Sequence, residues 1–181
     1  MGDRGWNRTG VEQLPPIVAR GVLLDIPAAK GLDELSPGYR ITREDIKYTL
    51  TVQGTDIAPG DVVLIRTGRM RHYSDGSRFM TNAPGLGMDA ARYLAGDRQA
   101  LSLGADNLSF EAFPSEDSEN YVPVHTYLLA QQGVTIMELV NLEQLAEDKV
   151  YQFAFIGTPL KIRGGDAAPL RPIAIPYTSA R

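Results

Sequence analysis

Short apolar segments alternate along this chain with segments of helical periodicity, and this alternation constrains the fold more than any other feature. Residues 21–26 and 62–66 are almost wholly apolar runs next to proline or turn residues, which is typical of strands buried on both faces of a sheet. Between them, Thr42 and Asp45 form a capping-box pattern that predicts a helix over 43–53. Strands that alternate with helices predict a mostly parallel sheet covered by helices, which is the α/β class.

The rest of the chain repeats this pattern, and we expect a single domain over 1–181. Further helices are predicted over 88–95, 125–132 and 142–146, and further strands over 100–104, 134–138 and 150–156. The remaining segments are an extended lead-in over 1–20, two polar segments expected to be surface loops over 67–87 and 111–123, and a proline-rich end over 159–176.

Composition excludes several classes of function. The net charge of −4 lacks the basic field that nucleic-acid binding requires. No apolar run approaches the roughly 20 residues that span a bilayer, and the first residues lack the apolar core of a signal peptide. We therefore expect a cytoplasmic protein with no nucleic-acid or membrane partner. The absence of cysteine excludes disulfides, thiolate metal sites and cysteine nucleophiles, and only His72 and His125 supply imidazole.

His125 and Glu138 are the candidate site residues. A helix from 125 and a strand ending near 138, joined at Gly133, bring both residues to the carboxyl edge of the sheet, where α/β proteins bind ligands. We expect the helix N-terminus to keep His125 neutral, so that its ring nitrogen can bind a metal ion. Imidazole and carboxylate together suit Zn²⁺ or Mn²⁺. From spacing alone, however, a capping histidine and a solvated glutamate are more common, and two ligands are fewer than the usual three.

Other polar residues have ordinary explanations. The arginines of the 67–87 region could clamp a substrate carboxylate, but solvated loop arginines are more common; they are Arg66, Arg69, Arg71 and Arg78. His72 is expected to be exposed and is assigned no metal. Asp106 and Asn107 follow a predicted strand, and we interpret them as turn residues rather than as groups that orient a ligand.

The segment from Pro123 to Ala146 resembles the cyclase family, which includes bacterial kynurenine formamidases and isatin hydrolases. Similar stretches occur in the same order elsewhere, at 14–25, 59–68, 159–164 and 171–175. The resemblance implies a β/β/α fold of the type called swivelling and a divalent-metal-dependent hydrolase of a C–N bond in an amide or cyclic amide. It places His125 and Glu138 at two metal-site positions of the family.

One departure from the family pattern is expected to matter for activity. The family signature His-x-Gly-Thr-His-x-Asp lies upstream of the segment that corresponds to 14–25, and this chain has no histidine before His72. We therefore expect the carboxyl-terminal two-thirds of a family member, incomplete at its N-terminus, with at most a weak metal site, impaired or absent activity and a tendency to form homo-oligomers. The alternatives are a non-catalytic α/β binding or scaffold domain, and a chain whose partner supplies the missing histidines.

Overall fold

The chain forms two compact units, which are described separately. The structure is a computed structural model that describes residues 10–177. The larger unit comprises residues 21–152, and the described part of the smaller unit comprises 10–20 and 153–177. The predicted lead-in falls partly on residues 1–9, which lie outside the described residues. The single-domain organisation stays a prediction.

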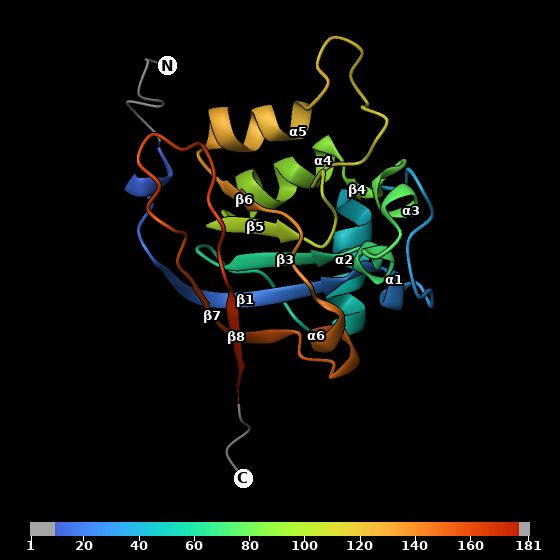
Figure 1. Ribbon diagram of the computed structural model, residues 1–181. Helices are drawn as coiled ribbons and strands as arrows, with labels where there is room; N and C mark the ends of the chain where they lie inside the picture. Colours follow the sequence, from blue (N-terminus) through green and yellow to red (C-terminus); the bar gives the residue numbers. More distant parts are fainter. Residues whose placement is uncertain (1–9, 178–181) are drawn as a thin grey trace. The chain divides into compact units, whose positions relative to one another are not determined.

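The larger unit is built on a parallel sheet, which confirms the α/β class (Figure 1). Its strands run in the order β6-β5-β3-β1, and each neighbouring pair is parallel. The bounds are β1 (Ile17–Asp25, of which 21–25 belong to this unit), β3 (Val62–Arg66), β5 (Ser102–Ala105) and β6 (Thr135–Met137). Two-residue strands β2 (Arg40–Ile41) and β4 (Gly85–Leu86) form a second parallel pair.

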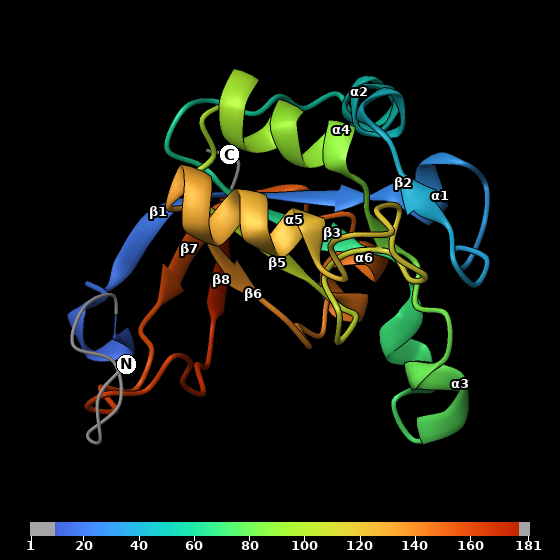
Figure 2. The same cartoon turned by 90° about the horizontal axis from the view of Figure 1, so that it is seen from above.

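Helical segments connect these strands. The α-helices of this unit are α1 (Ile26–Ala29), α2 (Arg43–Gln53), α3 (Gly76–Met80), α4 (Met88–Arg92), α5 (Pro123–His125) and α6 (Glu143–Glu147). The 3₁₀ segment η2 (Arg69–His72) precedes α3, while the π-helical segments η3 (Tyr93–Asp97) and η4 (Thr126–Gln132) continue α4 and α5. Helices α4 and α5 lie side by side (Figures 1 and 2).

Helix α2 has the predicted bounds because its sequence supplies both caps. The Thr42 hydroxyl accepts a hydrogen bond from the Asp45 backbone N–H at 3.2 Å, and the Asp45 carboxylate accepts one from the Thr42 N–H at 2.9 Å. Gly54 ends the helix in the left-handed region, at φ 61°. The capping box therefore satisfies N–H groups that a helix start otherwise leaves without a partner.

The two faces of the parallel sheet bury different residues. Side chains alternate along a strand, so Val63 and Ile65 face one way while Leu64 and Arg66 face the other. The first face belongs to a core that includes Ile46 of α2, Ala91 of α4 and Leu128 of η4, together with Val63 and Ile65. On the opposite face, a Cβ added to Gly104 would meet a Leu64 methyl at 2.7 Å, so the glycine allows the strands' side chains to pack closely there. Apolar packing on the helix-covered face fixes the register that positions the strand ends.

The smaller unit contains an antiparallel pair, β7 (Gln152–Gly157) with β8 (Ile173–Pro176). The 3₁₀ turn η1 (Val11–Gln13) joins this unit through the Val11 N–H, which donates to the Gly165 carbonyl at 2.9 Å. Strand β8 carries half-exposed apolar side chains at Ile173 and Ile175.

Two local expectations are corrected. The 67–87 segment is not a plain loop, because its polar residues form η2, α3 and β4. Strand β1 begins at Ile17, so the extended lead-in ends earlier than predicted. The 111–123 segment is irregular as predicted until α5 begins at Pro123. Among residues 10–177, no helix has the length and apolar character needed to cross a membrane.

Candidate functional site

His125 and Glu138 meet at the carboxyl edge of the parallel sheet. His125 is the third residue of α5, and Glu138 follows the last residue of β6. The His125 Nε2 atom lies 3.5 Å from a Glu138 carboxylate oxygen. Their side chains are 23% and 32% exposed, so the pair is accessible from solvent. The structure thus brings the two residues together, while their role as metal ligands stays a prediction.

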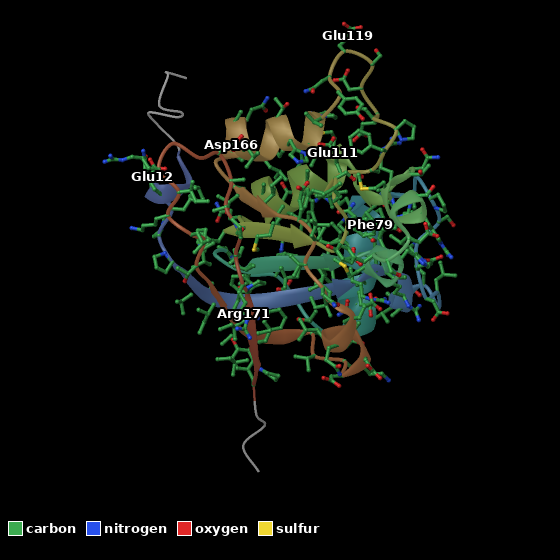
Figure 3. All side chains as sticks on the ribbon, in the orientation of Figure 1. Glu12, Phe79, Glu111, Glu119, Asp166 and Arg171 are labelled. Atoms are coloured by element: carbon green, nitrogen blue, oxygen red, sulfur yellow. The ribbon has the colours of Figure 1, made fainter. Side chains whose placement is uncertain are left out.

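Glu111 completes this cluster, and the sequence did not identify it. Its carboxylate accepts hydrogen bonds from the N–H groups of Val124 at 3.2 Å and His125 at 3.0 Å, at the start of α5. The same carboxylate lies 2.6 Å from His125 Nδ1. Glu111 is 2% exposed, and a parallel bridge to Leu86 fixes its backbone. Figure 3 marks its position beside α5.

The two carboxylates keep the His125 ring protonated in the metal-free chain. Burial lowers the pKa of His125, but hydrogen bonds and charge interactions with Glu111 and Glu138 outweigh it and raise the pKa to about 9. The expectation of a neutral imidazole is therefore wrong for the metal-free chain. The physical reason is that the Glu111 carboxylate occupies the N–H groups of the helix start and adds a full negative charge beside the ring.

An apolar wall supports the other side of the ring. Phe110 is fully buried and meets the His125 ring edge to face, with the centroids 6.4 Å apart and an interplanar angle of 88°. Phe110 adopts a φ of 54°, which is uncommon for an aromatic residue. The chain therefore turns sharply just before Glu111, and this turn places an aromatic ring and a carboxylate around one histidine.

Asp106 and Asn107 lie in a bend directly after β5, and both are fully buried and hold neighbouring segments. The Asp106 carboxylate accepts hydrogen bonds from the N–H groups of Thr67 at 2.9 Å and Gly68 at 2.8 Å. Burial raises its pKa even though these donors and the Thr67 hydroxyl oppose the rise. The Asn107 side-chain amide donates to the Pro84 carbonyl at 2.6 Å, and its backbone carbonyl accepts from the Leu139 N–H at 3.0 Å. Asn107 thereby fixes the turn that immediately follows Glu138.

The expectation of solvated loop arginines is wrong for Arg66 and Arg69. Arg66 is 5% exposed and binds Asp25 at 2.9 Å and both Glu143 carboxylate oxygens at 2.8 and 2.9 Å. Glu143 occupies two N–H groups of the Arg66 guanidinium, and Asp25 accepts from a third. Arg66 therefore links α6 to the ends of β1 and β3 and is not available to bind a substrate carboxylate. Arg69 is 3% exposed and donates to the carbonyl of Phe79 at 3.1 Å.

The other charged residues of this region lie nearer the surface. Arg71 and Arg78 are exposed, as predicted. Arg78 binds Glu34 at 2.6 Å. His72 also pairs with Glu34, and its side chain is only 18% exposed, so the expectation of an exposed histidine is wrong. Its carboxylate partner explains this burial, because pairing offsets the loss of hydration.

A cavity of about 380 Å³ is bordered by the segments that flank Glu111. Residues 108–109 and 113–115 contribute to its wall, as does Tyr121, two residues before α5. The opposite part of the wall includes Phe79 and Met80 of α3, and Figure 3 marks Phe79. The lining is mainly apolar, and its polar side-chain groups are the amide of Asn82, two serine hydroxyls and the Tyr121 hydroxyl. A small molecule with an apolar body fits such a lining.

The donor set fits one side of a metal site but does not complete it. His125 offers Nε2, Glu138 offers a carboxylate, and Glu111 binds the opposite ring nitrogen, which is the arrangement that metal-binding histidines usually have. Among residues 10–177, no group of three or more histidine, aspartate or glutamate side chains is arranged to hold an ion. The described residues would therefore supply two ligands to an ion bound here, and its other coordination positions would need water or other donors.

Comparisons with known proteins agree with this architecture. The family model named Cyclase matches residues 4–112. An isatin hydrolase from Roseibium aggregatum is 26% identical over 145 residues, which are 77% of this chain and 53% of that protein. A crystal structure of a novel cyclase has a TM-score of 0.82 and 34% identity, and the match covers 92% of this chain and 56% of the other.

A further solved structure shows the same fold. Isatin hydrolase A from Ralstonia solanacearum has a TM-score of 0.75 at 24% identity, covering 90% of this chain and 62% of that one. The chain thus spans 53% to 62% of the length of these relatives. The match to more than half of the chain, on a fold that solved cyclases share, shows that this protein belongs to the cyclase family.

Proposed function

We propose that this chain carries one side of the active site of a metal-dependent hydrolase that cleaves a C–N bond in an amide or cyclic amide. The observation that carries the proposal is the juxtaposition of His125 Nε2 and the Glu138 carboxylate, 3.5 Å apart, with Glu111 on the other ring nitrogen. Support comes from the likeness to a protein named isatin hydrolase. The substrate class is a small-molecule amide, either cyclic or a kynurenine-type formamide.

In this proposal the chain's own residues bind the metal ion, orient the histidine ring that holds it and exclude water from one side of that ring. His125 and Glu138 would hold a divalent ion, Zn²⁺ or Mn²⁺, which supplies a water molecule acidified for attack on a carbonyl. With an ion bound, Nε2 of the neutral imidazole would be the ligand atom, while Glu111 orients the ring by accepting the Nδ1–H. Phe110 shields one side of the ring from water. The cavity lined by residues 108–109 and 113–115, which flank Glu111 in the sequence, would hold the apolar part of a substrate.

Hydrolysis of isatin and of N-formylkynurenine by the purified chain with added Zn²⁺ or Mn²⁺ tests the proposal. His125→Ala and Glu138→Gln should each abolish any turnover that the chain supports. His72→Gln is the matched control, because it alters the other histidine of the sequence, which pairs with Glu34 and has no role in the proposed site. Turnover that survives in both His125→Ala and Glu138→Gln would contradict the assignment.

A chain that hydrolyses neither amide and binds neither ion would favour the alternative of a non-catalytic domain on the cyclase fold. One observation favours that alternative: the described residues bring together two ligand side chains rather than three. Metal titration of the same preparations separates the two cases, since a hydrolase site must bind the ion before it can act.

A further inference from the structure

We propose that Glu111 is a positioning residue that holds the His125 ring with Nδ1 protonated and with Nε2 directed to the Glu138 side as the ligand atom. The inference deepens the proposed function and rests on it for the identity of the ligand. It concerns the tautomer and the orientation of one ring, which can be measured in the chain alone.

The Glu111 carboxylate is held by contacts that do not involve the His125 ring. One carboxylate oxygen accepts from the Val124 N–H at 3.2 Å, and the other accepts from the His125 N–H at 3.0 Å. Its backbone packs closely against β4, because a Cβ added to Gly85 would lie 2.6 Å from the Glu111 carbonyl oxygen. At 2% exposure, no solvent competes for the carboxylate. These contacts position the Glu111 carboxylate independently of the orientation of the His125 ring.

The fixed carboxylate determines which nitrogen of the neutral ring carries the proton. The 2.6 Å separation between Nδ1 and Glu111 requires a proton between them, because two acceptors at that distance would repel each other. Nε2 lies on the opposite side of the ring, 3.5 Å from Glu138, and its lone pair is then available to a ligand. Without the carboxylate, the ring can take either tautomer and rotate. Loss of such a partner typically costs about 10- to 100-fold in metal affinity.

Zinc titration calorimetry of three forms of the full chain tests this inference. Glu111→Gln keeps the size of the side chain and removes its charge, and we expect it to bind Zn²⁺ about 10- to 100-fold more weakly than the unaltered chain. Glu119→Gln makes the same chemical change at an exposed position in the loop that Figure 3 shows away from the sheet, and it should bind as the unaltered chain does. Equal affinities for all three forms would overturn the proposal.

Nitrogen-15 NMR of the unaltered, metal-free chain gives a readout that does not depend on the variant folding or on activity. Above the His125 pKa of about 9, where the ring is neutral, its long-range couplings should show the Nδ1–H tautomer. Glu111→Gln should lower the population of that tautomer. A predominant Nε2–H tautomer in the unaltered chain would overturn the inference. If the chain binds no Zn²⁺ but shows the Nδ1–H tautomer, the metal proposal fails while the positioning role stands.

Discussion

Stability of the metal-free chain should depend on pH through His125. The pKa of His125 rises from 6.5 to about 9 on folding, because two carboxylates outweigh the burial of the ring. A group whose pKa is raised by folding stabilises the native state fully below its unfolded pKa, and this stabilisation is lost as pH rises through the folded pKa. The window therefore runs from 6.5 to about 9.

The magnitude follows from the same values. Each pH unit of pKa difference corresponds to about 1.4 kcal/mol, so a rise from 6.5 to about 9 contributes about 3 kcal/mol to the free energy of unfolding. His125→Gln keeps a polar side chain of similar length and cannot be protonated. The difference in unfolding free energy between the unaltered chain and this variant should therefore shrink by about 3 kcal/mol between about pH 6 and pH 10.

Urea unfolding followed by circular dichroism, with a chelator present, measures this difference at each pH. Gly76→Ala changes no titratable group and has open space for its methyl, so it serves as the control, and its difference from the unaltered chain should stay constant across the window. Taking differences between variants cancels the titration of other groups. A constant difference between the unaltered chain and His125→Gln over the whole range would refute the account of His125 as a cation held by two carboxylates.

Two further predictions concern the residues that hold the edge of the sheet. Arg66→Met should lower the free energy of unfolding by about 3–5 kcal/mol, because Asp25 at 2% exposure is left without its cation, and adding Asp25→Asn should recover part of that loss. Thermal unfolding of both variants checks this, and no recovery in the double variant would contradict it. Gly85→Ala should cost about 1–3 kcal/mol, because its Cβ would meet the backbone of Glu111, whereas Gly76→Ala has open space and should change stability by less than about 0.5 kcal/mol. Denaturant midpoints that are equal for the two alanine variants would count against this account of the packing.

Short sequence patterns were sufficient to predict those helices and strands that are specified by a few neighbouring residues. Helix α2 and strand β3 have the predicted bounds, because a capping box and a continuous apolar run specify them within a few residues. Strand β1 was predicted too short because Ile17–Arg20 directly follow Pro15 and Pro16, a pair typical of extended, irregular chain. The 67–87 segment was misjudged because short helices of polar residues carry little periodic signal.

The candidate site was predictable only in part. The edge at which His125 and Glu138 meet follows from element order and from the lengths of one helix and one strand. Glu111 carries no such signal: it lies 14 residues before His125, in an irregular segment, and only the folded chain brings its carboxylate to the helix start. The burial of Arg66 likewise depends on Glu143, a residue 77 positions away in sequence. The surroundings of His125 and Arg66 thus depend on contacts with residues distant in the sequence, and a single sequence does not reveal such contacts.

Crystals of the chain soaked in Zn²⁺ and measured at the zinc absorption edge would locate the ion that His125 and Glu138 are proposed to share. We predict one anomalous peak that lies about 2.0–2.2 Å from both His125 Nε2 and a Glu138 carboxylate oxygen, with Glu111 still bound to Nδ1. The same experiment on His125→Ala should lose the peak. A zinc ion found away from this pair, or one bound by Glu138 alone in the unaltered chain, would contradict the claim that His125 and Glu138 share a metal ion.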